Sequence, residues 1–163
     1  MKITIRRATA DDAKEIIDVI NSVIAEQKYT IFDKPFSEEQ ERNFISSLGN
    51  RSVLFMAEID GTIARMDLLS ALPTSSMSHV ATMGTWLRSK FRCSGIGRLL
   101  AEESLRFARE NGYRKIVIQV LADNERALRF YRSLGFNDIG IARQHISLPD
   151  GFHDEVYLEK LLQ

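Results

Sequence analysis

Two arginines and two glycines that could bind an anion lie close together between Arg92 and Arg98. A hydrophobic segment, 79–87, precedes this run, and an amphipathic pattern follows it, so we expect strand, turn and helix. The first turn of a helix has backbone N–H groups without intrahelical partners and carries partial positive charge. Because Gly95 and Gly97 have no side chains to keep a phosphate away from these amides, the run predicts a pyrophosphate cradle.

Two familiar phosphate motifs are excluded by their spacing. A P-loop needs a glycine, four residues and then Gly-Lys-Ser/Thr, and the sequence contains no such string. The dinucleotide fingerprint needs a third glycine three residues after Gly97, but that position is Leu100, and the motif belongs in the first strand–helix turn. The cradle must therefore serve another phosphate-containing ligand.

Apolar periodicity predicts the elements that position this cradle. The predicted strands are Lys2–Arg7, Val53–Ile59, Thr62–Leu69, His79–Leu87, Lys115–Leu121, Ile139–Leu148 and Phe152–Leu162. The first helix has Ala13, Ile16, Ile17, Ile20 and Ile24 on one face, and the third has Ile96, Leu99, Leu100, Ser104, Phe107 and Ala108. Ser37 with Gln40 forms a capping box for the second helix, and Asp123-Asn124 caps the fourth.

These elements predict a single α/β (α+β) domain, residues 1–163. Asp60-Gly61 is a strong hairpin signal, and Pro149-Asp150-Gly151 joins a C-terminal β-hairpin. Lys115–Leu121 is the best candidate for a buried strand. Several hairpins mean that the sheet should be mostly antiparallel.

Composition narrows the class of protein further. Lys plus Arg equal Asp plus Glu at 22 each, which argues against nucleic acid as the main partner, and 44% of the residues are hydrophobic. The N-terminus lacks the apolar run of a signal peptide, and no segment is long enough to cross a membrane, so we expect a cytoplasmic protein. Cys93 is the single cysteine, which excludes an internal disulfide and a multi-cysteine metal site.

A second motif, Asn-x-x-Ala-x-x-x-Tyr-x-x-x-Gly-Phe, follows the cradle and is filled by Asn124, Ala127, Tyr131, Gly135 and Phe136. With both motifs in order, the sequence resembles the GNAT superfamily of acetyl-CoA-dependent N-acetyltransferases over nearly its whole length. The resemblance implies one GNAT-like domain with a mixed sheet and helices on both faces. The chain's ending resembles the bacterial subgroup that acts on amino acids and small amines.

The resemblance implies that acetyl-CoA enters between the strand ending near Leu87 and the strand Lys115–Leu121, which splay apart. The implied cofactor-binding residues are Leu87, Arg92, Cys93, Ser94, Gly95, Ile96, Gly97, Arg98, Asn124 and Tyr131. Cys93-Ser94 departs from the family pattern, because many members carry a glycine and a cation there. Arg65 also departs from it, since a glycine is common at its position.

Acetyl transfer to an amine requires a neutral amine, stabilisation of an oxyanion and a proton for the departing thiolate. Tyr131 stands at the family's general-acid position, although its place on an apolar helix face would equally suit packing. His79 is the candidate base on the strand before the cradle, since its pKa is ordinarily near neutrality. Glu26, Asp33 and Asp67 are further candidates, and deprotonation by solvent is an alternative.

We expect direct transfer without a covalent enzyme intermediate, because Cys93 would lie beside the phosphates rather than the thioester. No metal is expected, since His145 and His153 lack ligand spacing. The acceptor should contact Glu26, Tyr29 and Phe32, together with the hairpin 144–154. A small-molecule amine is favoured over a protein N-terminus, a homodimer is possible, and a non-catalytic acetyl-CoA sensor is the alternative.

Overall fold

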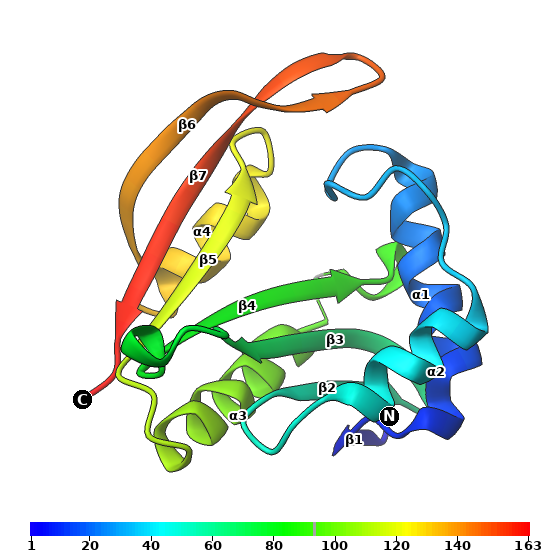
Figure 1. Cartoon of the computed structure of the whole chain (residues 1–163). Coiled ribbons are helices and arrows are strands. Elements are labelled where there is room, and N and C mark those ends of the chain that lie inside the picture. Colours follow the sequence, from blue (N-terminus) through cyan, green and yellow to red (C-terminus); the bar gives the residue numbers. More distant parts are fainter. Residues whose placement is uncertain (93) are drawn as a thin grey trace.

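Residues 1–92 and 94–163 are described by a computed structural model, and within them seven strands form one sheet in the order β1-β2-β3-β4-β5-β7-β6 (Figure 1). The strands are β1 (Ile3–Arg7), β2 (Val53–Ile59), β3 (Thr62–Ala71), β4 (Val80–Leu87), β5 (Lys115–Leu121), β6 (Asn137–Leu148) and β7 (Gly151–Leu161). The α-helices are α1 (Ala13–Glu26), α2 (Glu38–Ser47), α3 (Ile96–Glu110) and α4 (Glu125–Ser133).

The described strand pairs are antiparallel apart from β4 with β5, which confirms the prediction of a mostly antiparallel sheet. The parallel pairing is short, running from Val80↔Lys115 to Thr82↔Val117. By contrast, β3 accompanies β4 to its end at Leu87, and β7 accompanies β5 to Leu121. The sheet therefore separates into two wings at the carboxyl ends of β4 and β5 (Figure 1).

Helices cover both faces of the sheet, as expected. Successive side chains of a strand point to opposite faces, and β2 contributes to two separate cores. Leu54 and Met56 pack with α1 and α2, whereas Phe55 and Ala57 pack with α3 and α4. Because of this two-sided covering, β2 has buried side chains at all of its positions except Glu58.

Two local sequence predictions, a tight turn and a helix cap, are confirmed at the ends of elements. Asp60 and Gly61 both take left-handed backbone angles, with φ of 49° and 80°, as the predicted turn between β2 and β3 requires. The Ser37 hydroxyl accepts a hydrogen bond from the Gln40 amide, which closes the predicted capping box of α2.

Two sequence predictions about burial are wrong. Leu99 was placed on the core face of α3, but its side chain is 46% exposed. Ala101 and Leu105 complete the buried arc, which turns Leu99 towards solvent. The strand β5 is also less buried than β2, because Lys115, Val117 and Gln119, which alternate along the strand and so share one face, are not buried.

Candidate active site

The gap between β4 and β5 is the central feature of the site. Beyond Thr82 the strand β4 pairs with β3 alone, so its backbone groups on the β5 side face the gap. Leu87 lies at the end of this free edge, as the sequence predicted. An extended ligand could pair with β4 here as an added strand would.

The predicted cradle lies at the start of α3, directly after β4. Gly95 is the N-cap residue with a left-handed φ of 77°, and α3 begins at Ile96, whose side chain is 1% exposed. The Ser94 hydroxyl is buried and has no hydrogen-bond partner among the residues that the structure describes. A buried orphan hydroxyl beside a helix N-terminus favours an anionic ligand. The predicted contact of Cys93 lies outside the described residues.

Arg92 connects the predicted cradle to residues that the sequence predicts to contact the acceptor. Its Nη2 donates to both carboxylate oxygens of Glu26, at 2.8 and 2.6 Å, and its guanidinium lies 5.4 Å from the centre of the Tyr29 ring. Arg98 leans instead towards the end of α4, where its Nη2 lies 3.3 Å from the Ser133 hydroxyl. The structure thus joins one predicted cofactor residue to two predicted acceptor residues.

Arg65, which the sequence left without a role, extends beneath the cradle. Its side chain is 6% exposed, and its guanidinium lies 4.7 Å from the centre of the Phe130 ring. A Cβ added at Gly97 would lie 2.6 Å from Arg65 Nη1. Gly97 therefore leaves room for this buried cation, in addition to opening the first turn of α3 to a ligand.

A chain of hydrogen bonds leads from Arg65 to Tyr131. Arg65 Nε donates to Asp67 Oδ1 at 3.1 Å, and the Thr85 hydroxyl donates to the same oxygen at 2.9 Å. The Tyr131 hydroxyl donates to Thr85 Oγ1 at 2.8 Å. Burial raises the pKa of Tyr131 above its ordinary value of 10, so its phenol stays protonated near neutral pH.

Asn124 caps α4 as predicted. Its side-chain oxygen accepts a hydrogen bond of 3.2 Å from the Ala127 amide. The side-chain nitrogen is a separate donor, so capping is compatible with a second contact to a ligand in the gap. This cap lies directly after β5 and fixes the direction in which α4 carries Tyr131.

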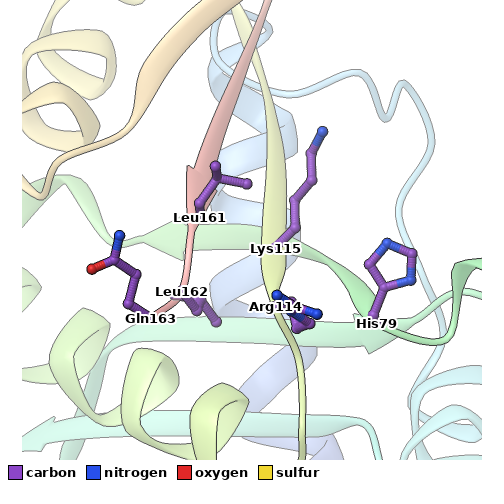
Figure 2. Close-up of a pocket in the computed structure, with 6 residues that line it drawn as sticks. All are labelled: His79, Arg114, Lys115, Leu161, Leu162 and Gln163. Atoms are coloured by element: carbon purple, nitrogen blue, oxygen red, sulfur yellow. The ribbon is translucent and has the colours of Figure 1, made fainter.

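His79 lies at the opposite end of β4 from Tyr131's partner Thr85. Its carbonyl accepts hydrogen bonds from the amides of Arg114 and Lys115, where β4 and β5 begin together. The side chain lines a hollow of about 660 Å³ with Arg114, Lys115 and the chain end Leu161–Gln163 (Figure 2). Thr85 follows His79 by six positions, or roughly 20 Å along an extended strand, so the structure does not bring His79 to Tyr131.

The predicted acceptor residues lie in and beside the connection from α1 to α2. Tyr29 and Phe32 are 41% and 39% exposed, and Phe32 packs edge-on against Phe36 with ring centres 5.3 Å apart. Glu26 is the last residue of α1. The hydrogen bond with His153 lowers the pKa of Asp150, in the β6–β7 turn, and the charge of Lys28 adds a smaller contribution.

His153 ties the β6–β7 hairpin to the turn before α4. Its Nδ1 contacts Asp123, and its Nε2 lies 2.7 Å from Asp150 Oδ1. The hydrogen bond to Asp123, followed by that to Asp150, raises the His153 pKa above 6.5. The sequence placed His153 in the hairpin expected to contact the acceptor, but no short-range pattern in it indicated this link.

Thr85, Arg65 and Asp67 are the other residues whose positions in the site did not follow from the sequence. Arg65 and Asp67 are two positions apart on one strand, so their side chains share a face, and that spacing was an available signal for a pair. Nothing in the sequence pairs Thr85 with Tyr131, since β3–β4 register and the path of α4 bring them together.

Comparisons with known proteins identify the family of the chain. Residues 18–136 match the family model described as the acetyltransferase (GNAT) family. The [ribosomal protein bS18]-alanine N-acetyltransferase of Escherichia coli K12 is 27% identical over 119 residues, which cover 72% of this chain and 77% of that one. The phosphinothricin N-acetyltransferase of Streptomyces viridochromogenes is 21% identical over 153 residues, which cover 93% of this chain and 84% of that one.

Solved structures show the same fold. An N-acetyltransferase from Staphylococcus aureus Mu50 has a TM-score of 0.94 at 20% identity, with all of both chains covered. A phosphinothricin acetyltransferase from Sinorhizobium meliloti, in complex with acetyl-CoA, has a TM-score of 0.91 at 21% identity and covers 99% of this chain and 89% of that chain.

The fold and the site thus define an acyltransferase, and the chain belongs to the GNAT acetyltransferase family. It is an acetyl-CoA-dependent N-acetyltransferase. The residues present fit acetyl-CoA as co-substrate, because the buried Ser94 hydroxyl, unpartnered among the described residues, and the left-handed Gly95 lie at the start of α3, after the open edge of β4. Within the described residues, no helix combines the length and apolar character needed to span a membrane.

The contact between Gly97 and Arg65 generates a stability prediction. Gly97→Ala should lower the free energy of unfolding by about 1–3 kcal/mol, because the new methyl group forces the Arg65 guanidinium or Phe130 to move. This loss should outweigh the gain of about 1 kcal/mol in helix propensity. Urea unfolding measures the change, with Gly49→Ala as the control because a Cβ there meets nothing within 4 Å. Equal stability of the two variants would contradict the close contact.

The His153 contacts generate a pH prediction. A raised pKa in the folded state stabilises the protein below pH 6.5, and this contribution is lost as pH rises through the folded value. His153→Gln should therefore destabilise the protein at pH 6 and have a smaller effect at pH 9, as measured by urea unfolding. His145→Gln is the matched control, because that side chain is 51% exposed and 3.7 Å from Glu155. A pH-independent effect of His153→Gln would refute the prediction.

Proposed function

We propose that the chain transfers acetyl directly from acetyl-CoA to the primary amine of a small molecule, such as an amino acid. One observation carries the chemistry: the Tyr131 hydroxyl is buried at the gap between β4 and β5, within 2.8 Å of Thr85 on the open strand. That gap is where the thioester enters if the cradle at Ser94 and Gly95 holds the pyrophosphate.

Acetyl-CoA supplies an activated acyl group with a thiolate as its leaving group. Tyr131 acts as the general acid that protonates this thiolate, and its raised pKa keeps the proton in place until it is needed. The cradle arginines and the first-turn amides of α3 hold the phosphates, while Asn124 donates to the pantetheine arm. With these contacts, acetyl-CoA would lie along the open edge of β4.

The amine must lose a proton before it attacks. An alkyl ammonium group with a pKa of ~10.4 is neutral in about four molecules per ten thousand at pH 7. Glu26 and Asp67 are ion-paired with arginines, and His79 lies at the other end of β4. We therefore assign deprotonation to solvent rather than to any of these three side chains.

Two observations support a small acceptor over a protein N-terminus. The match to the phosphinothricin enzyme spans 93% of this chain, whereas the match to the bS18 enzyme spans 72%. The acceptor side also brings two segments near one another, since the charge of Lys28 reaches Asp150 in the hairpin turn. Tyr29 and Phe32 are the proposed acceptor contacts, and Glu26 acts through Arg92.

Release of free thiol from acetyl-CoA tests the acceptor class. The panel consists of amino acids, phosphinothricin and small alkyl amines. These are compared with a peptide of ribosomal protein bS18 that has alanine at its N-terminus. Small amines should give the higher kcat/KM. A preference for the peptide would contradict the proposed substrate class, and tight acetyl-CoA binding without turnover on any amine would favour a sensor.

Tyr131→Phe tests the proposed general acid. Removing the hydroxyl should lower kcat by about 10²–10⁴-fold, because the thiolate must then leave unprotonated. The KM for acetyl-CoA should change little, since the ring and its packing against Phe136 remain.

Tyr113→Phe is the matched control for this steady-state comparison. Tyr113 is another buried tyrosine, but its hydroxyl bonds the Arg51 carbonyl, away from the gap. Its substitution should leave kcat near the wild-type value. An unchanged kcat in Tyr131→Phe would remove Tyr131 from the mechanism.

A further inference from the structure

The Thr85 hydroxyl lies between the proposed general acid and a buried ion pair. It is 2.8 Å from the Tyr131 hydroxyl and 2.9 Å from Asp67 Oδ1, and Arg65 Nη2 lies 3.4 Å from it. These groups come from three elements, namely α4, β4 and β3. Thr85 therefore bonds both to Tyr131 and to the ion pair, while Arg65 also lies close to the Tyr131 hydroxyl itself.

Chemistry sets the direction of the bonds in the resting protein. The Asp67 carboxylate, paired with Arg65, can only accept hydrogen bonds. Thr85 has one hydroxyl hydrogen, so it donates that hydrogen to Asp67 and accepts from Tyr131. In the resting protein, therefore, the hydroxyl hydrogen of Tyr131 points at Thr85 Oγ1.

The Thr85 hydroxyl can also adopt a second orientation among the same partners. If the Thr85 hydroxyl rotates, it donates to the Tyr131 oxygen instead of to Asp67. Asp67 stays satisfied, because Arg65 Nε still donates to Oδ1 at 3.1 Å and the Ser104 hydroxyl lies 3.5 Å from Oδ2. The exchange leaves no buried carboxylate oxygen without a partner, which keeps its cost small.

We propose that Thr85 is a positioning residue for the general acid, which exchanges its hydrogen bond from Asp67 to Tyr131 as the Tyr131 proton is transferred. The Tyr131 O–H bond breaks, and the proton forms an S–H bond on the departing thiolate of coenzyme A. The phenolate oxygen left behind accepts the Thr85 hydrogen bond. The proton released by the attacking amine reaches the phenolate through solvent and restores the hydroxyl.

Arg65 and Asp67 contribute to this exchange by fixing the position of the Thr85 hydroxyl. Arg65 Nη2 lies 3.4 Å from Thr85 Oγ1. The Arg65 charge, which also reaches Tyr131 directly, favours an anionic phenolate, whereas the Asp67 charge opposes it. Gly97 makes room for this guanidinium at the first turn of α3. The inference rests on the proposed function for its catalytic part, whereas the bond from Thr85 to the Tyr131 oxygen does not depend on turnover.

The test compares Thr85→Val, which keeps the shape without the hydroxyl, with Thr85→Ser, which keeps the hydroxyl. Thr82→Val is the control, because Thr82 lies on the same strand but pairs with β5. With a good amine from the panel, Thr85→Val should lower kcat by about 10- to 100-fold, the loss expected for a hydrogen bond to a charged oxygen. The KM for acetyl-CoA should change less than twofold, and Thr85→Ser and Thr82→Val should stay close to wild type.

A titration gives the readout that is independent of activity. The protein is prepared with 3-fluorotyrosine at its four tyrosines, and the Tyr131 resonance is assigned by its absence in Tyr131→Phe. In fluorine NMR, Thr85→Val should move ionisation of Tyr131 to higher pH, because the phenolate loses its donor, whereas Thr85→Ser should not.

The two measurements test separate parts of the proposal, namely the hydrogen bond to Tyr131 and its effect on catalysis. A Tyr131 titration that is the same in Thr85→Val and wild type would overturn the proposal, whatever the activities are. A shifted titration with unchanged kcat would overturn its catalytic part. If wild type turns over no amine, the proposed function fails, and the titration still decides whether Thr85 holds the Tyr131 oxygen.

Discussion

The strands β4 and β5 stay paired over three residue pairs and then separate, and the rest of the site depends on this geometry. Each strand keeps its other neighbour, β3 or β7, so the two halves of the sheet remain continuous while the edge between them opens. The open edge exposes backbone groups at the point where α3 begins. α4, which follows β5, then places Tyr131 against β4 and closes the base of the gap.

A buried ion pair lies behind Thr85 and Tyr131. Arg65 and Asp67 are almost fully buried, and removing one partner of such a pair typically costs about 3–5 kcal/mol because the other charge is stranded. The pair contributes less to net stability than this figure suggests, since both ions are desolvated on folding. We regard it as a device that sets the positions of Thr85 and Tyr131 in the free enzyme.

Two ionic links join the donor and acceptor sides. Arg92, beside the cradle, binds Glu26 at the end of α1, and His153, in the hairpin, binds Asp123 beside the cap of α4. Each link crosses a long distance in sequence and ends next to a residue that we assign to acetyl-CoA, Ser94 in one case and Asn124 in the other. The segments that would receive an amine are therefore attached to the elements that hold the donor.

The sequence by itself determined the local features. The left-handed turn at Asp60-Gly61, the Ser37 capping box and the glycines of the cradle each depend on residues a few positions apart, whose backbone preferences act over that range. The two motifs around Gly97 and Tyr131 were sufficient to identify the family, because their order and spacing rarely occur together by chance. Periodicity also predicted most of the core, and it failed at Leu99, where the buried arc of α3 is rotated by its contacts with the sheet.

Only the tertiary structure decided which side chains meet in the gap. Arg65 reaches Gly97 because β3 passes beneath the start of α3, and Thr85 meets Tyr131 because α4 returns across the separated strands. His79 and Tyr131, which the sequence offered as a possible base and acid, lie towards opposite ends of β4. Such contacts depend on strand register and helix paths set by the whole core, so no short-range pattern in the chain encodes them.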